Sequence, residues 1–152
     1  KRKFKIGKIL APVDFSECSM AGAVYAAFLA KTFDATLCLF HVVQRPPPPV
    51  LVDRVRSPFP ERELTIANAR LEMEALSKLD FLSDAKCAVD VRTGWPVDEI
   101  CGQASQPDVD LVVISTHGRT GFNRILLGSV AEQVVRYADC PVMVVPSRNS
   151  HS

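Results

Sequence analysis

The sequence has no long apolar run, no paired-cysteine motif and no excess of charge of one sign. Eighteen Lys and Arg residues stand against 17 Asp and Glu, so the formal net charge is +1. Such a balance leaves no large electrostatic footprint for duplex nucleic acid or for an anionic membrane. The apolar stretch from Met20 to Ala30 ends at Lys31, short of the roughly 20 residues that a bilayer span needs. We therefore expect neither a nucleic-acid partner nor a membrane-spanning segment.

The cysteines are few and unpaired in the sequence. There are five, at positions 18, 38, 87, 101 and 140, with no Cys-x-x-Cys spacing. An odd, scattered set argues against a disulfide framework and against a zinc site, so no metal ligands are expected. Lys8, Pro12 and Asp14 interrupt the apolar stretch that a signal peptide would carry. A cytoplasmic location is expected, with most thiols packed as small core hydrophobes.

The composition is that of one packed domain. The chain has 152 residues, of which 47% are hydrophobic and 23% charged. These values are ordinary for a globular protein, and the length is close to one domain. We expect a single domain over residues 1–152.

Short apolar runs alternate with stretches of helical periodicity. The runs that predict strands are residues 8–13, 36–43, 87–91, 110–114 and 141–145. Little polar alternation within them is typical of parallel strands covered on both faces. Helices are predicted after a cap at Asp14 or Ser16, and over 61–79, 97–104 and 129–138. This order predicts an α/β, doubly wound (Rossmann-like) parallel five-stranded sheet with helices on both faces.

Two of these helices have a periodic apolar face, and a proline-rich segment lies between them. In the first helix the face is formed by Val24, Tyr25, Phe28 and Leu29, and in the second by Leu64, Ala67, Leu71, Ala75 and Leu79. The segment 44–60 holds six of the 11 prolines. Proline lacks the N–H that regular structure needs, so this segment is predicted to be a long surface loop.

The stretch from Ile114 to Ser129 carries most of the functional information. It follows the fourth strand, contains several glycines and ends at a predicted helix start. Glycines let backbone N–H groups approach a phosphate closely and adopt torsions that other residues resist, while a helix N-terminus offers unpaired N–H groups. No Gly-Lys-Ser/Thr triplet occurs, and no Gly-x-Gly-x-x-Gly follows the first strand, which excludes the common phosphate loops. Turn and cap roles alone would also account for the glycines.

The residues of this stretch resemble the universal stress protein family, and the likeness extends from Lys8 to Pro146. Nucleotide-binding members carry Gly-x2-Gly-x9-Gly-Ser/Thr after strand four. Gly118, the nine residues that follow it, Gly128 and Ser129 match this pattern, whereas Ser115 replaces the first glycine. The segments 12–16 and 41–42 resemble the family's ends of strands one and two.

The resemblance implies a sheet of order 3-2-1-4-5 with ATP, alone or with Mg²⁺, over strands one and four. Carried over by position, Pro12, Val13 and Asp14 would flank adenine and ribose, and Val42 would meet the adenine edge. Ile114, Ser115, His117, Gly118, Gly128, Ser129 and Val130 would surround ribose and phosphates. A homodimer through the apolar fifth strand is also implied. Asp14 as a plain helix cap and His41 as a core histidine are the simpler interpretations of those two residues.

Two functions from different classes follow. The first is an ATP-binding regulatory domain of the stress response. The second is a dimeric interaction module of the same fold that works without nucleotide, for which Ser115 is the argument. No catalytic residue is assigned and at most very slow hydrolysis is expected, because no Asp or Glu occurs from Ser115 to Ser129.

Overall fold

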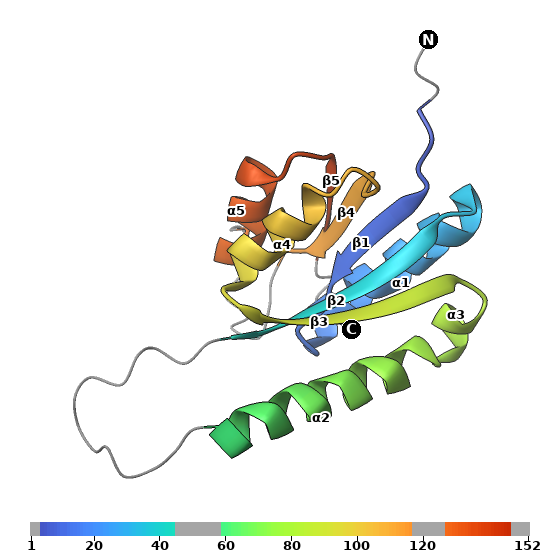
Figure 1. The fold of residues 1–152 in the computed structure, drawn as a ribbon. Coiled ribbons are helices and arrows are strands. Elements are labelled where there is room, and N and C mark those ends of the chain that lie inside the picture. Colours follow the sequence, from blue (N-terminus) through green and yellow to red (C-terminus); the bar gives the residue numbers. More distant parts are fainter. Residues whose placement is uncertain (1–3, 45–58, 117–126, 147–152) are drawn as a thin grey trace, which may run out of the picture.

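The structure, a computed structural model, describes residues 4–44, 59–116 and 127–146 (Figure 1). Its strands are β1 (Lys8–Pro12), β2 (Thr36–Gln44), β3 (Lys86–Gly94), β4 (Leu111–Ser115) and β5 (Val142–Val145). Its helices are α1 (Glu17–Phe33), α2 (Phe59–Ser77), α3 (Asp80–Ser83), α4 (Pro96–Ala104) and α5 (Ser129–Tyr137). All strand pairs are parallel, in the order β3-β2-β1-β4-β5. The predicted doubly wound sheet and its order are confirmed.

Helices cover both faces of the sheet. Helices α1, α2 and α3 pack on one face and α4 and α5 on the other (Figure 1). Successive strand residues point to opposite faces, so in β4 Val113 joins the α1 side while Val112 and Ile114 join the α4 and α5 side. The largest fully buried side chains all come from these two clusters: Phe40, Ile9, Leu10, Leu37, Leu39, Met73, Leu82, Val112, Val113 and Val134.

Helix α1 buries the face opposite to the predicted one. Its apolar periodicity favoured Val24, Tyr25 and Phe28, but Val24 is 44% exposed and Phe28 is 65% exposed. The residues that lie on the sheet are small: Ser19, Gly22, Ala23, Ala26, Ala27 and Ala30. Small side chains let the helix approach large strand side chains closely, so packing density rather than side-chain hydrophobicity decides which face is buried.

Helix α2 begins earlier than predicted and also buries a different face. It starts at Phe59, and β2 runs to Gln44, so both ends of the predicted loop 44–60 belong to regular elements. Residues 45–58 lie outside the described residues. Among its residues from Thr65 on, whose burial the structure describes, Ala69, Met73 and Leu76 are buried, whereas Leu71 is 64% exposed. The short helix α3 was not predicted.

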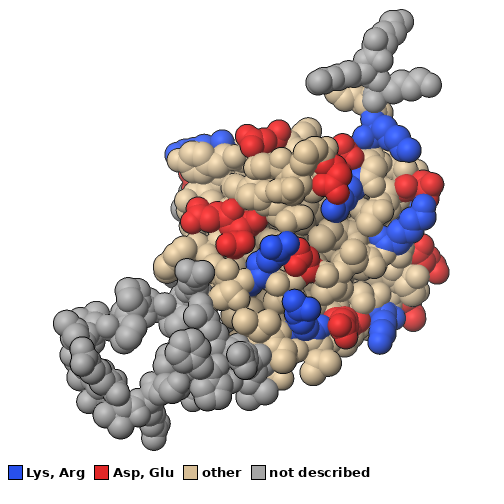
Figure 2. Space-filling model, in the orientation of Figure 1, with Lys and Arg blue, Asp and Glu red and all other residues tan. Residues whose placement is uncertain are grey.

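The surface carries charges of both signs. Figure 2 shows Lys and Arg side chains interspersed with Asp and Glu over the face that it presents. Within the described ranges, no helix is long and apolar enough to cross a membrane.

Candidate functional site at the carboxyl edge of β1 and β4

The direction of winding reverses between β1 and β4. Strand β1 pairs with β2 from Lys8 to Pro12, but its register with β4 covers only Ile9 opposite Leu111 and Leu10 opposite Val112. Beyond these pairs, β1 leads into α1 on one face of the sheet, and the chain after β4 leads to α5 on the other. In doubly wound folds, ligands bind where two neighbouring strands diverge in this way.

The predicted residues at the end of β1 lie at this point. Pro12 is half-buried, and Val13 is buried with its N–H donating to the carbonyl of Phe40 over 2.8 Å. Asp14 is half-buried, and its Oδ1 accepts hydrogen bonds from both the backbone N–H, at 3.0 Å, and the hydroxyl of Ser16. Ser16, not Asp14, is the N-cap of α1. The cap interpretation of Asp14 is therefore wrong, and its carboxylate lies between β1 and the cap.

His41 holds the segment after β1, and it is half-buried rather than the core histidine of the simpler interpretation. Its Nδ1 donates to the carbonyl oxygen of Val13 over 2.6 Å. Its ring lies 4.6 Å from that of Phe15, centroid to centroid, at an interplanar angle of 45°. Phe15 has φ of 65°, in the left-handed region that non-glycine residues rarely adopt. Sequence reasoning missed this contribution from Phe15, because no motif indicates it.

Val42 extends the site along β2. Because Pro12 pairs with Phe40, Val42 lies two residues further toward the carboxyl edge. It is half-buried and packs against the α4 and α5 cluster. The structure thus places Val42 next to the end of β1, where the resemblance located the adenine edge.

Ser115 ends β4 with its side chain toward α1. It is 8% exposed, and Ile114 before it is 5% exposed and faces the opposite cluster. A Cβ built on Gly22 of α1 would lie 3.4 Å from Ser115 N and 3.7 Å from Ser115 Cβ. The side chain that replaces the first motif glycine therefore occupies space that Gly22 leaves open. Glycine within an alanine-rich helical stretch is the sequence signal that indicates such a close approach.

The start of α5 completes the site. Gly128 is its N-cap, and the Gly128 N–H donates to the carbonyl of Thr116 over 2.6 Å. Gly128 has φ of −57° and ψ of 151°, torsions open to any residue, so the expectation of special glycine torsions here is wrong. Ser129 is exposed and Val130 is half-buried. The first-turn N–H groups of a nine-residue helix lack intrahelical partners and suit an anion.

Two predicted residues, His117 and Gly118, lie outside the described residues. The others converge from β1, β2, β4 and α5 on one edge of the sheet. Among the described residues, no group of three or more His, Cys, Asp or Glu side chains is arranged to hold a metal ion. The site offers backbone donors, one carboxylate and a serine hydroxyl rather than a metal cage.

Fold and site together define an α/β domain of the doubly wound class with its candidate site at the switch point. Residues 5–146 match the model of the universal stress protein family. Universal stress protein MJ0531 of Methanocaldococcus jannaschii is 37% identical over 143 residues, covering 91% of this chain and 81% of that protein. The chain belongs to the universal stress protein family.

Solved structures agree with this assignment. UspA from Lactobacillus plantarum superposes with a TM-score of 0.76 at 26% identity, covering 94% of this chain and 99% of the other. Protein MJ0577 of M. jannaschii gives a TM-score of 0.69 at 31% identity, covering 95% and 99%. Two further universal stress proteins of the same fold were solved with nucleotides, one with cAMP at 22% identity and one from Archaeoglobus fulgidus with dAMP at 21%.

Proposed function

We propose that this chain is an ATP-binding universal stress protein, a stress-response regulatory domain that holds the nucleotide at the carboxyl edge of β1 and β4. The observation that carries the proposal is the orientation of Ser115. Its Cβ lies on the α1 side, against the position of Gly22, so the replaced motif residue adds no bulk on the opposite side of β4. The argument for a module without nucleotide rested on Ser115, and this geometry weakens it.

Each part of ATP has a plausible neighbour in the site. Half-buried Val42 presents apolar surface for adenine, and Asp14 lies where a ribose hydroxyl would donate to a carboxylate. The Val13 side chain is buried in the cluster on the α1 side, so this residue flanks the ligand only as part of the backbone after β1. The first turn of α5 offers N–H groups and the Ser129 hydroxyl to the phosphates. Glu132 in the same turn is unfavourable for an anion, but it pairs with Arg136 at 3.4 Å. The nucleotides bound by two neighbours of the same fold, cAMP and dAMP, support an adenine ligand.

A homodimer through β5 is the second part of the proposal. The two edge strands differ in charge: β3 carries Lys86, Asp90 and Arg92, whereas β5 is Val-Met-Val-Val. Charged residues protect a sheet edge from pairing with another chain, and an uncharged edge invites it. Met143 of β5 is 39% exposed, which leaves apolar surface at that edge.

The location proposed is the cytoplasm. All five cysteines are described by the structure and all are free thiols. Free thiols are stable in a reducing compartment, where disulfides seldom form.

Calorimetric titration with ATP and Mg²⁺ tests nucleotide binding. We expect Gly128→Val to abolish measurable binding, because a branched side chain blocks the approach of a phosphate to the backbone of the α5 N-terminus. Ser129→Ala should weaken binding by about 1.5–3 kcal/mol if the hydroxyl donates to a charged oxygen. The matched control is Gly102→Val on α4, where an added Cβ meets nothing within 4 Å.

The outcomes separate the two functions. Loss of binding in Gly128→Val but not in Gly102→Val, with both proteins folded, supports the nucleotide site. Wild-type affinity in Gly128→Val contradicts it. A folded dimer that binds no nucleotide, and from which mass spectrometry detects none after purification, would favour the interaction module.

A further inference from the structure

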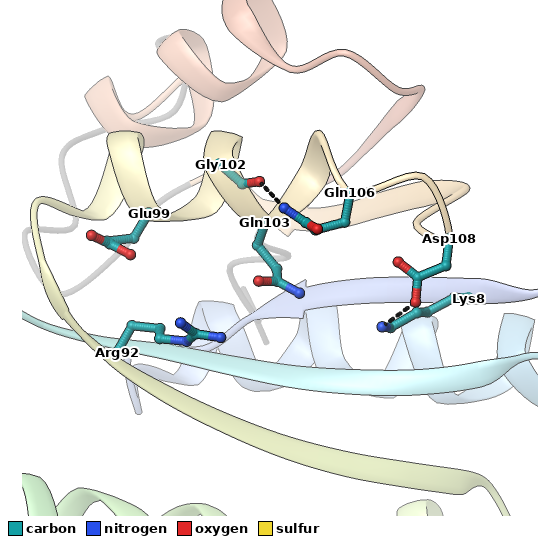
Figure 3. Close-up of a pocket in the computed structure, with 7 residues that line it drawn as sticks. All are labelled: Lys8, Arg92, Glu99, Gly102, Gln103, Gln106 and Asp108. Atoms are coloured by element: carbon teal, nitrogen blue, oxygen red, sulfur yellow. Dashed lines mark hydrogen bonds and ion pairs between the residues drawn. The ribbon is translucent and has the colours of Figure 1, made fainter.

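A polar cavity lies on the α4 face of the sheet, away from the switch point. We call it the α4 groove; it encloses about 400 Å³, between α4 and strands β1 and β3 (Figure 3). Residues that line it are Lys8, Arg92, Glu99, Gly102, Gln103, Gln106 and Asp108. Helix α2 covers the other face of β3, and α4 lies over β2, so on this side the β3 residues Asp90 and Arg92 border open space.

One end of the groove holds a guanidinium and a carboxylate that do not pair with each other. Arg92 donates through Nε to both carboxylate oxygens of Asp90 at 3.1 Å. Its terminal nitrogens make no further hydrogen bond to the described part of the chain, and Figure 3 shows the guanidinium directed beneath α4 toward Gln103. Glu99 lies above it at the same end, and its carboxylate has no ion pair within the described ranges.

Gly94 makes room for that carboxylate. A Cβ built on Gly94 would lie 2.6 Å from Glu99 Oε1 and 2.8 Å from Glu99 Cγ. Any larger residue would displace the Glu99 side chain, and at φ of 158° it would also be strained. Because Gly94 at the end of β3 has no side chain, the Glu99 carboxylate can lie at this position in the groove.

At the other end of the groove, the two charged side chains pair with each other. Lys8 Nζ donates to Asp108 Oδ2 over 2.7 Å. Between the two ends, the Gln103 amide points down toward the strands and offers both a donor and an acceptor. No hydrogen bond of that amide to another described residue is present.

This arrangement limits the chemistry of a ligand. With Asp90, which accepts from Arg92 Nε, three carboxylates stand against the two cations Lys8 and Arg92, so a multiply charged anion such as a phosphate ester would be repelled. Few apolar groups line the groove, which disfavours an aliphatic ligand. Among the described residues no set of three potential ligands suits a metal ion. What remains is a small molecule that carries one positive and one negative charge close together, with polar groups beside them.

We propose that the α4 groove binds a free α-amino acid with a polar side chain. The two terminal nitrogens of Arg92 form a planar fork that matches a carboxylate. Glu99 accepts from the α-ammonium, which is attached one carbon away from that carboxylate. The side chain of the amino acid then lies under Gln103 and runs toward the Lys8–Asp108 ion pair.

The proposal is tested by titrating the full-length protein with L-glutamine, followed by calorimetry and by amide chemical shifts in NMR. The protein side chains that face the two charges of the ligand are neutralised one at a time, and the ammonium of the ligand is then blocked. Arg92→Gln and Glu99→Gln should each weaken binding at least tenfold, because each removes a charge-assisted hydrogen bond. The matched controls are Arg70→Gln on α2 and Asp98→Asn beside Glu99, exposed residues outside the groove, and both should bind as the wild type does.

N-acetyl-L-glutamine, which lacks the ammonium, gives a result that unfolding of a variant cannot explain. It should bind wild-type protein at least tenfold more weakly than L-glutamine, and Glu99→Gln should weaken it no further. ATP titration of the same samples, together with their melting curves, separates misfolding or failure of the nucleotide site from failure of the groove.

Two results would overturn the proposal. One is the absence of heat and of shift changes in the groove for L-glutamine, L-asparagine and L-serine up to about 10 mM, with folded wild-type protein. The other is binding that stays at the wild-type level in both Arg92→Gln and Glu99→Gln.

Discussion

Gly22 of α1 and Ser115 of β4 form a size-matched contact between helix and sheet. A side-chain atom at position 22 would lie 3.4 Å from the Ser115 backbone nitrogen and 3.7 Å from its Cβ. Because Gly22 has no side chain, position 115 can carry one at the point where β4 reaches the candidate site. Both the stability of the fold and the shape of the site depend on this contact.

Gly22→Leu should destabilise the protein by about 1–3 kcal/mol, because its branched side chain would overpack the contact with Ser115. Gly22→Ala is the control: its Cβ meets Ser115 at ordinary contact distance, and alanine is the better helix former by about 1 kcal/mol. Urea unfolding measures both. The double variant Gly22→Leu with Ser115→Gly should recover part of the loss. A Gly22→Leu protein as stable as Gly22→Ala would contradict the close contact.

Ser115→Gly should leave the affinity for ATP within about threefold of the wild type, since its Cβ lies on the α1 side of β4. The free energy of unfolding should fall by roughly 0.5–1 kcal/mol, because glycine in a strand loses more backbone entropy on folding. Calorimetric titration and thermal unfolding check the two parts. A change in affinity above tenfold would mean that the serine side chain itself contacts the ligand.

Light scattering should give twice the chain mass, as expected of a symmetric dimer. Met143→Lys should convert this dimer to a monomer, because a lysine on an edge strand opposes pairing with a second chain. Leu71→Lys on α2 is the matched control: it places the same charge at an apolar residue that is 64% exposed, and the dimer should persist. A wild-type monomer at micromolar concentration, or a dimer unaffected by Met143→Lys, would contradict a dimer interface at β5.

ATP hydrolysis should be very slow or absent. Fast hydrolysis needs a residue that orients or deprotonates water at the γ-phosphate. The Oδ1 of Asp14 is held by Ser16 at the end of the site that the resemblance assigns to adenosine, and Glu132 in the first turn of α5 pairs with Arg136. A single-turnover assay with radiolabelled ATP and Mg²⁺ measures the rate. Turnover near the typical enzyme value of about 10 per second, lost in Gly128→Val, would show that the protein is an ATPase.

Stability should fall at alkaline pH partly through Cys38. Burial, with Asp90 nearby, raises the pKa of the Cys38 thiol from its ordinary value of 9.0 to about 11. A raised pKa in the folded state stabilises the fold below pH 9, and this contribution is lost as the pH rises through 11. Urea unfolding between pH 8 and 11 should therefore lose roughly 1–2 kcal/mol more in the wild type than in Cys38→Ala. Parallel pH dependence in the two proteins would show that the pKa of Cys38 is the same in the folded and unfolded states, and would contradict its burial.

The alternation of strands and helices could be predicted because each element is encoded locally, by an apolar run or a helical period. The buried faces of α1 and α2 could not. Apolar period alone favoured Phe28 and Leu71, whereas the sheet accepts the small residue Ala27 and the flexible Met73. Tertiary packing decides that choice, and one sequence carries little information on it. The start of α2 at Phe59 was missed because Pro60 indicated a loop, although a proline in the first turn fits a helix.

The candidate site could be predicted as far as its residues follow one another in the chain. Gly128 and Ser129 lie in one motif, and Asp14 follows a strand directly. The partner of Ser115 is Gly22, 93 positions away in the chain, and no motif joins them. The α4 groove was likewise invisible, because Lys8, Arg92 and Glu99 meet only once β1, β3 and α4 are assembled.

The hydrogen bond from His41 to Val13 has a consequence for the thermodynamics of ligand capture. Together with the Phe15 ring and the Ser16 cap, it holds the β1 side of the site in one conformation before any ligand arrives. Because these residues are already ordered in the folded protein, ligand binding does not have to order them, and the affinity is not reduced by that entropic cost. We expect this half of the site to act as a rigid template, with small entropic losses and little change in its amide exchange when ligand binds.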